Sequence, residues 1–338
     1  MRRQITTSVL GDAIIIASCA LLCVTALASC ADPPPPTRGH VVVALTIDWE
    51  GVAITPEAID AMEDLRRRAG ATPITHFVSA AYYTSGADPV EVSRSLQRLV
   101  RGDDELAVHL HGWGSLVQAS DVAPRLAPSF LTGTDKLLEF DGADRGFDTD
   151  LDTYDVVALR AMLRRSRTLL AQSGRPVSRS FRAGGYLGTP KMLRALRAEG
   201  FTVDSSATHP DQFDAAYGLL STRVRELWPT VDATTQPFVI ADPVAPIIEL
   251  PLAAIADNAE ADELVGVIAR AGERLARAPT HDVFVVLGFH FETSPEYGER
   301  IAAALEAVRA RPDLAAHLEF TTIEAMGARA RRHLDPRP

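Results

Sequence analysis

From Val41 onward, short apolar runs alternate with segments whose apolar residues recur at helical spacing. The run Val41–Leu45 is continuously apolar, which is typical of a strand buried on both faces of a parallel sheet. In the segment that follows, Thr55 is a candidate N-cap, Pro56 suits the first helical position, and Gly70 marks the end of a helix. The alternation predicts repeated βα units and therefore a mostly parallel sheet.

The chain contains about eight strand candidates, most of them separated by helical segments. They are Val41–Leu45, Ile74–Val78, Glu105–Leu110, Ser180–Arg182, Phe201–Val203, Ile247–Leu250, Val283–Phe289 and Leu318–Thr321. Such a series forms an open sheet or a closed barrel. Residues 41–334 continue without a second linker, which favours a distorted (β/α) barrel with seven or eight parallel strands. Residues 111–152 and 205–245 interrupt the alternation after strands, so we expect both stretches on the face where barrel active sites form.

The composition excludes several classes of protein. Apolar residues make up 46% of the 338 residues and charged residues 23%, which is ordinary for a globular chain. Apolar runs long enough to span a membrane are absent after the N-terminal segment, which excludes a multi-span membrane protein. Lys and Arg number 34 against 44 Asp and Glu, and the resulting net charge of -10 argues against nucleic acid as a partner.

The N-terminal segment predicts export. Two arginines near the start, an apolar stretch and small residues at its end describe a signal peptide over residues 1–29. The ending Leu27–Cys30 resembles the bacterial lipobox, which implies lipid attachment at Cys30, a membrane anchor, and a position facing the periplasm or cell exterior. An uncleaved anchor helix is the alternative. Residues 30–40 contain four consecutive prolines and are expected to form an extended tether.

Polar residues gather where four of the predicted strands end. Asp48 and Glu50 follow the first strand, and His290 ends the run that begins at Val283; the other members are His109 and His111 on the third strand and Arg182 on the fourth. The carboxyl ends of barrel strands form one face, so these residues are expected to converge on a functional site. Their structural alternatives are a helix cap for Asp48, a loop charge for Glu50, a surface ion pair for Arg182 and a core histidine for His290.

His109 and His111 are two residues apart, so both imidazoles leave a strand on the same face. This geometry suits two ligands of one metal ion. All three cysteines lie within the first thirty residues, which restricts a metal site in the body of the chain to histidine and carboxylate ligands. Zn²⁺ is the first expectation, and other divalent transition ions remain possible.

An ordered set of motifs resembles the polysaccharide deacetylases with the NodB-like fold, also called carbohydrate esterase family four. The resemblance extends from Val41 to about Arg331, and no single motif carries it. The matching segments are Thr46–Glu50, Thr72–Val78, Glu105–His111, Phe181–Tyr186, Gly200–Ser206, Ile248–Pro251 and Leu287–His290. Two departures indicate a divergent branch. Trp113 stands where the family's second histidine is usual, and Trp49 stands where its metal-binding Asp is usual.

The resemblance implies a metal-dependent hydrolase that removes N-acetyl or O-acetyl groups from a cell-envelope or extracellular polysaccharide. His109 and His111 would bind the metal together with Glu50, unless Asp48 is itself the carboxylate ligand. In the first arrangement Asp48 would be the general base and Arg182 would orient it in its ionised form.

The remaining residues also take roles from the resemblance. His290 would protonate the departing amine. The tetrahedral oxyanion would be stabilised by the metal and by a backbone N–H near Tyr186. Trp113 and Tyr186 would stack on sugar faces, with packing in the core or a loop as the alternative, and Asp204 would support His290 or a ligand.

Two other functions remain open from the sequence. One is a metal hydrolase of the same fold that acts on an amide or ester other than a sugar acetyl group. The other is a carbohydrate-binding surface lipoprotein whose site has degenerated. The catalytic interpretation requires Asp48, His109, His111 and His290 to converge on one cavity. The polymer, the membrane in which the anchor lies and the oligomeric state are not readable from the sequence.

Overall fold

The computed structural model describes residues 38–140, 144–242 and 245–334. The predicted signal peptide, the lipid attachment at Cys30 and the greater part of the proline tether therefore lie outside the described residues and stay predictions. Within the described ranges, no helix is both long and apolar enough to cross a lipid bilayer.

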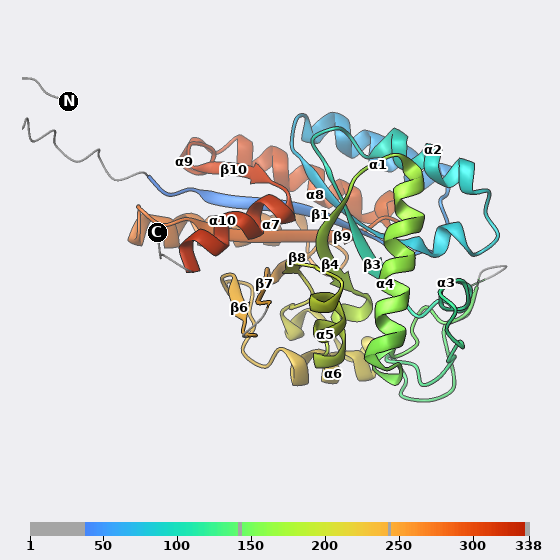
Figure 1. Cartoon of the computed structure of the whole chain (residues 1–338). Coiled ribbons are helices and arrows are strands. Elements are labelled where there is room, and N and C mark those ends of the chain that lie inside the picture. Colours follow the sequence, from blue (N-terminus) through green and yellow to red (C-terminus); the bar gives the residue numbers. More distant parts are fainter. Residues whose placement is uncertain (1–37, 141–143, 243–244, 335–338) are drawn as a thin grey trace, which may run out of the picture. The chain divides into compact units, whose positions relative to one another are not determined.

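Within the described residues, ten strands join in one sheet. Figure 1 labels most of them. The strands are β1 (Val41–Trp49), β2 (Ile74–Ser79), β3 (Glu105–Leu110), β4 (Val177–Ala183), β5 (Val203–Asp204), β6 (Phe238–Ile240), β7 (Ile247–Glu249), β8 (Leu252–Ile255), β9 (Val283–His290) and β10 (Leu318–Thr321). Their order is β6-β7-β5-β4-β3-β2-β1-β9-β8, with β10 beside the first residues of β1. All pairs are parallel except β6 with β7.

The segment that contains β7 and β8 curls the sheet into a distorted barrel. β7 pairs with β5, and β8, which begins three residues after β7 ends, pairs with β9 on the opposite side. The sequence predicts a single strand over Ile247–Leu250 and none over Leu252–Ile255. Pro251 separates the two strands because it has no backbone N–H to donate.

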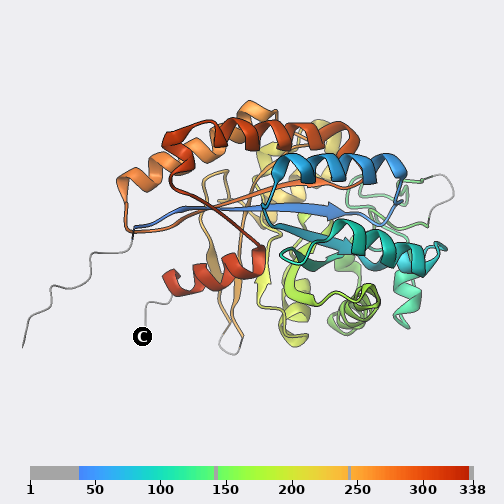
Figure 2. The same ribbon diagram turned by 90° about the horizontal axis from the view of Figure 1, so that it is seen from above.

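Most helices cover the outer face of this sheet, and the two that contain Leu220 and Met326 pack instead against the apolar cluster on its inner face (Figure 2). The helices are α1 (Pro56–Ala69), α2 (Pro89–Leu99), α3 (Gly114–Ala119), α4 (Val156–Leu170), α5 (Pro190–Ala198), α6 (Leu219–Leu227), α7 (Ala261–Arg277), α8 (Ser294–Arg309), α9 (Pro312–Ala315) and α10 (Ile323–Leu334). The predicted start of α1 is confirmed: the Thr55 side chain accepts a hydrogen bond from the Ala58 N–H, and Pro56 occupies the first turn.

Along the longer strands such as β1, β3 and β9, alternate residues enter two separate apolar clusters. Val41, Val43 and Leu45 of β1 pack with residues of the surrounding helices, whereas Val42 and Ala44 join a second cluster inside the barrel. This period of two sets which side chains can meet in the interior. On β1 it directs Asp48 inward and Trp49 outward, toward the helix layer.

Candidate active site

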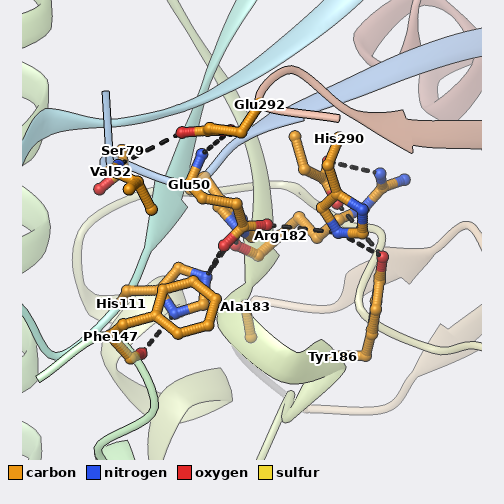
Figure 3. Close-up of polar contacts among 12 residues, drawn as sticks. Glu50, Val52, Ser79, His111, Phe147, Arg182, Ala183, Tyr186, His290 and Glu292 are labelled. Carbon is orange, nitrogen blue, oxygen red and sulfur yellow. Dashed lines mark hydrogen bonds and ion pairs between the residues drawn. The ribbon is translucent and has the colours of Figure 1, made fainter. Parts of the chain in front are cut away.

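The barrel interior collects the polar residues predicted at the strand ends. Four of them lie at strand positions whose side chains face the barrel interior, at the carboxyl ends of their strands: Asp48 on β1, His109 on β3, Arg182 on β4 and His290 on β9. Contacts among them and Glu50 join one cluster, part of which is drawn in Figure 3. The convergence that the sequence predicts is therefore present in the structure.

Glu50, His109 and His111 form the part of this cluster that could hold a metal ion. One ligand atom from each lies within 4.8 Å of the others. The Nε2 atoms of the two histidines are 3.1 Å apart, His109 Nε2 is 3.4 Å from Glu50 Oε1, and His111 Nε2 contacts Glu50 Oε2. Both histidine side chains are only 2% exposed and that of Glu50 is 10% exposed, so the cluster is shielded from bulk water.

The other nitrogen of each imidazole is held by a backbone carbonyl. His109 Nδ1 lies 2.9 Å from the Arg182 carbonyl oxygen, and His111 Nδ1 lies 2.6 Å from that of Phe147. A carbonyl oxygen only accepts, so these contacts place the ring proton on Nδ1 and leave both Nε2 lone pairs facing Glu50. The cluster thus presents three acceptors to one point, which a cation would satisfy.

The pKa shifts agree with a site that favours positive charge beside Glu50. Burial by itself would raise the pKa of Glu50, but the charges of His111 and His109 hold it well below its usual range. Burial likewise would lower the pKa of His109, and the Glu50 carboxylate raises it instead. In the metal-free site, a proton on an imidazole Nε2 can be the partner of the Glu50 carboxylate. A divalent cation bound here would take the place of that Nε2 proton.

Arg182 forms a buried ion pair with Asp48. Its guanidinium is fully buried and donates to Asp48 Oδ1 at 2.7 Å and to Thr46 Oγ1 at 2.8 Å. It also donates to the carbonyl and the hydroxyl of Ser205, each at 2.9 Å, and lies over the Phe77 ring at 4.3 Å. Such complete pairing fixes the carboxylate and offsets the cost of burying its charge.

His290 is paired with Asp257, which the sequence reasoning missed. His290 Nδ1 lies 2.9 Å from Asp257 Oδ1, and its Nε2 faces Glu50 Oε1 at 3.3 Å and the Tyr186 hydroxyl at 3.4 Å. Burial lowers the pKa of His290, but the Asp257 and Glu50 charges outweigh it and raise the value to about 10. Asp257 follows the apolar run Leu252–Ala256 directly, the same signal that singled out Asp48.

Three further predictions concerned substrate contacts, and the structure corrects two of them. Trp113 is fully buried, its ring lies near those of Phe140 and Phe147, and its indole N–H donates to the Glu50 carbonyl at 2.8 Å. Neither face of this ring can stack on a sugar. Tyr186 is 5% exposed, and its hydroxyl lies 3.5 Å from Asp48 Oδ2, so it lies at the site and its contact with a sugar stays a prediction.

Asp204 is the second correction. Val203 points into the barrel, so Asp204 points out of it, where it pairs in register with Glu249 on β7 and accepts from Ser206 Oγ at 2.5 Å. Burial raises the pKa values of both Asp204 and Glu249. Asp204 therefore belongs to a buried acidic pair. It is not part of the group Glu50, His109 and His111, which we call the metal-type cluster, and it does not pair with His290.

Glu292 received no role from the sequence, although it stands two residues after His290. Its Oε2 accepts the Glu50 N–H and its Oε1 the Val52 N–H, each at 3.2 Å (Figure 3). Oε1 also contacts the Tyr82 hydroxyl. Burial and the nearby Glu50 charge raise the pKa of Glu292 to about 7. This carboxyl ties the loop after β1 to the end of β9.

No protein-family model and no curated protein matches the sequence. Among solved structures, the chain is similar to two bacterial proteins that are named provisionally as polysaccharide deacetylases. The protein from Mycobacterium smegmatis is 14% identical with a TM-score of 0.54, over 90% of this chain and 94% of that one. The protein from Pseudomonas aeruginosa PAO1 is 12% identical with a TM-score of 0.51, over 88% and 93%. These similarities show a shared fold and confirm the predicted distorted (β/α) barrel.

Proposed function

We propose that the protein is a metal-dependent hydrolase that removes acetyl groups, N-linked or O-linked, from a polysaccharide. The observation that carries this proposal is the convergence of Asp48, Glu50, His109, His111 and His290 from three separate strand ends. These residues supply the parts of a hydrolytic site: potential metal ligands, a buried carboxylate (Asp48) paired with an arginine, and a partly exposed histidine (His290). The shared fold with two proteins named as polysaccharide deacetylases supports the choice of substrate class.

The metal would be held by Glu50, His109 and His111. These residues fit a divalent ion because both histidines donate Nδ1–H to carbonyl groups and turn Nε2 toward Glu50. Two imidazoles and one carboxylate are a ligand set typical of catalytic Zn²⁺, which keeps a position open for water. When bound there, the ion would polarise the acetyl carbonyl and lower the pKa of its water.

Asp48 would act as the general base. Arg182 occupies its Oδ1, while Oδ2 lies on the side of Tyr186 and His290 and remains able to accept a proton from water. The fixed guanidinium keeps the carboxylate in one orientation throughout the reaction. Glu50 is the ligand and Asp48 the base in this proposal because Asp48 already has a buried cation as its partner.

His290 would act as the general acid. Asp257 accepts from Nδ1, so Nε2, which faces Glu50 and Tyr186, is the atom that can donate. Its side chain is 24% exposed, more than those of the other members of the cluster, which places it at the entrance where a sugar amine would leave. Water would add to the acetyl carbon, the bond from that carbon to nitrogen would break, and His290 would protonate the nitrogen, yielding acetate and an amine.

The test combines metal content with acetate release. We expect the purified protein to hold about one divalent ion and to release acetate from acetylated chito-oligosaccharides. Asp48→Asn should lower kcat roughly 10²- to 10⁴-fold with the metal retained, and His111→Ala should lose the metal. His281→Ala, an exposed histidine before β9, is the matched control and should change neither quantity.

Other outcomes identify other functions. Bound metal without acetate release from any acetylated sugar would favour hydrolysis of a different amide or ester. Absence of metal, with sugar binding unaffected by His109→Ala and His111→Ala, would favour a carbohydrate-binding protein. Either result refutes the deacetylase proposal.

We also propose that the enzyme is anchored to a membrane through lipid on Cys30, as the Leu27–Cys30 motif suggests. Labelling with radioactive palmitate in a bacterial host tests this. We expect label on the wild-type protein and none on Cys30→Ser, and equal labelling of the two would refute the anchor.

A further inference from the structure

The backbone of Glu50 is held on both sides, at its N–H and at its carbonyl, by side chains from distant parts of the chain. Its N–H donates to Glu292 Oε2 at 3.2 Å, and its carbonyl accepts from Trp113 Nε1 at 2.8 Å. Glu292 is 242 residues away in sequence and Trp113 is 63 residues away. Both contacts act on the backbone of the residue that supplies the carboxylate of the metal-type cluster.

Glu50 needs such restraint because it lies just beyond the sheet. β1 ends at Trp49, and its last register partners are Val78 on β2 and, one residue earlier, His290 on β9. The strand's period of two directs Trp49 outward and Glu50 inward again. The inward residue that can reach His109 and His111 is thus the first one without ladder hydrogen bonds to a neighbouring strand.

Glu292 restrains this loop from the side of β9. Besides the Glu50 N–H, its carboxyl accepts the Val52 N–H at 3.2 Å and contacts the Tyr82 hydroxyl. The N–H groups of Glu50 and Val52 thus donate to the same carboxylate, which fixes the path of the loop between these two residues. Hydrogen bonds from backbone N–H to a carboxylate are among the stronger ones in proteins.

Trp113 restrains the loop from the opposite side. Its ring is fully buried, so the indole N–H has a fixed direction. The chain approaches it so closely at Gly51 that a Cβ there would lie 2.8 Å from both Trp113 Nε1 and Ser79 Oγ. Gly51 also has φ of 90°, a conformation that favours glycine.

We propose that Glu292 and Trp113 are positioning residues: they hold the Glu50 N–H and carbonyl so that the Glu50 carboxylate faces His109 and His111. Neither side chain would touch the metal or the substrate. The inference rests on the proposed function, because it assumes that these three residues bind a metal ion. It also explains why this chain carries tryptophan at position 113 and a carboxylate two residues after His290.

The experiment measures Zn²⁺ affinity by competition with a chromophoric chelator, and records the visible spectrum of the Co²⁺-loaded protein. Trp113→Phe removes the indole N–H and keeps an aromatic ring, and Glu292→Gln keeps the side-chain volume and one acceptor oxygen. We expect each variant to bind Zn²⁺ about 10- to 100-fold more weakly than the wild type, with an altered Co²⁺ spectrum.

Two matched controls separate positioning from a general loss of packing. Trp49→Phe removes another buried indole N–H, which donates to His76 Nδ1 at 3.1 Å on the outer face. Glu105→Gln alters another buried carboxyl, which accepts from Thr75 and Ser178. Both controls should lower the urea midpoint and leave the Zn²⁺ affinity and the Co²⁺ spectrum as in the wild type.

The outcomes distinguish the two proposals. If the wild type binds Zn²⁺ and the Trp113 and Glu292 variants bind it no more weakly than the controls, the positioning role is wrong while the proposed function stands. If the wild type binds no divalent ion, the proposed function is wrong and this inference is overturned with it. Circular dichroism of each variant verifies that it is folded before the affinity is measured.

Discussion

Arg182→Met is the substitution for which the structure predicts the largest loss of stability. The methionine would retain much of the apolar stem over Phe77 but none of the four hydrogen bonds to Asp48, Thr46 and Ser205. It would leave the Asp48 carboxylate, whose side chain is 3% exposed, without its cation.

The magnitude follows from this burial. Breaking a buried ion pair by removing one partner typically costs about 3–5 kcal/mol, because an uncompensated charge remains in the interior. Domains are usually stable by only about 5–15 kcal/mol, so the loss is a large fraction of the whole. Asp48→Asn should cost less, since Arg182 keeps its bonds to Thr46 and Ser205.

The assay is urea unfolding of the metal-free protein at neutral pH, followed by circular dichroism. A double-mutant cycle with Arg182→Met and Asp48→Asn should show a coupling energy of at least about 2 kcal/mol. The reason is that Asp48→Asn removes the buried carboxylate charge that Arg182→Met leaves without a partner. Arg182→Lys keeps the charge and should fall between the wild type and Arg182→Met. The exposed pair Arg98–Glu63 is the control, where Arg98→Met should cost far less stability than Arg182→Met because water screens the pair.

Additive effects of the two substitutions, within about 0.5 kcal/mol, would refute the reasoning. So would a loss for Arg182→Met no greater than that for Arg98→Met. Either result would mean that Asp48 and Arg182 are not a coupled buried pair, and that the orientation of the proposed general base has another origin.

Three further predictions concern pH and backbone strain. Asp257→Asn removes the charge that raises the pKa of His290, so the loss of kcat/KM at high pH should begin at least about one unit lower than in the wild type; coincident pH profiles would contradict this. Burial alone would raise the pKa of Asp104, but an adjacent imidazole and guanidinium lower it from 3.8 to about 2. This lowered pKa contributes stability that is present above pH 4 and lost as the pH falls toward 2, so Asp104→Asn should reduce the acid dependence of the unfolding free energy by about 2 kcal/mol. Gly146→Ala should cost more stability than Gly70→Ala, because a Cβ at 146 would lie 2.4 Å from a backbone oxygen and one at 70 meets nothing within 4 Å, although both glycines have positive φ; equal urea midpoints would contradict the difference.

The sequence was sufficient to predict the alternation of strands and helices, apart from β6 and β8, and the positions of the main polar residues at the strand ends. Runs such as Val41–Leu45 and the Thr55–Pro56 helix start depend on local periodicity and capping, which are readable within a few residues. Asp48, His109 and His290 were accessible for the same reason, since each follows a mainly apolar run, whereas Arg182 follows only a short strand candidate.

The same reasoning failed at a short strand, where the orientation of Asp204 was predicted wrongly. β5 comprises only Val203–Asp204, too few residues to reveal which of them faces the interior. Asp204 was therefore given a role in the site, although it points out of the barrel beside Glu249. On β1, by contrast, nine residues display the alternation clearly enough to separate Asp48 from Trp49.

By itself, the sequence determined a chain of βα units with histidine and carboxylate chemistry at one end, because those properties depend on neighbours in the sequence. Only the tertiary structure decided the partners: Asp257 for His290, the Phe147 carbonyl for His111, and Glu292 with Trp113 for the Glu50 peptide. These contacts join residues separated by 33 to 242 positions, and they exist only where the barrel brings its loops together.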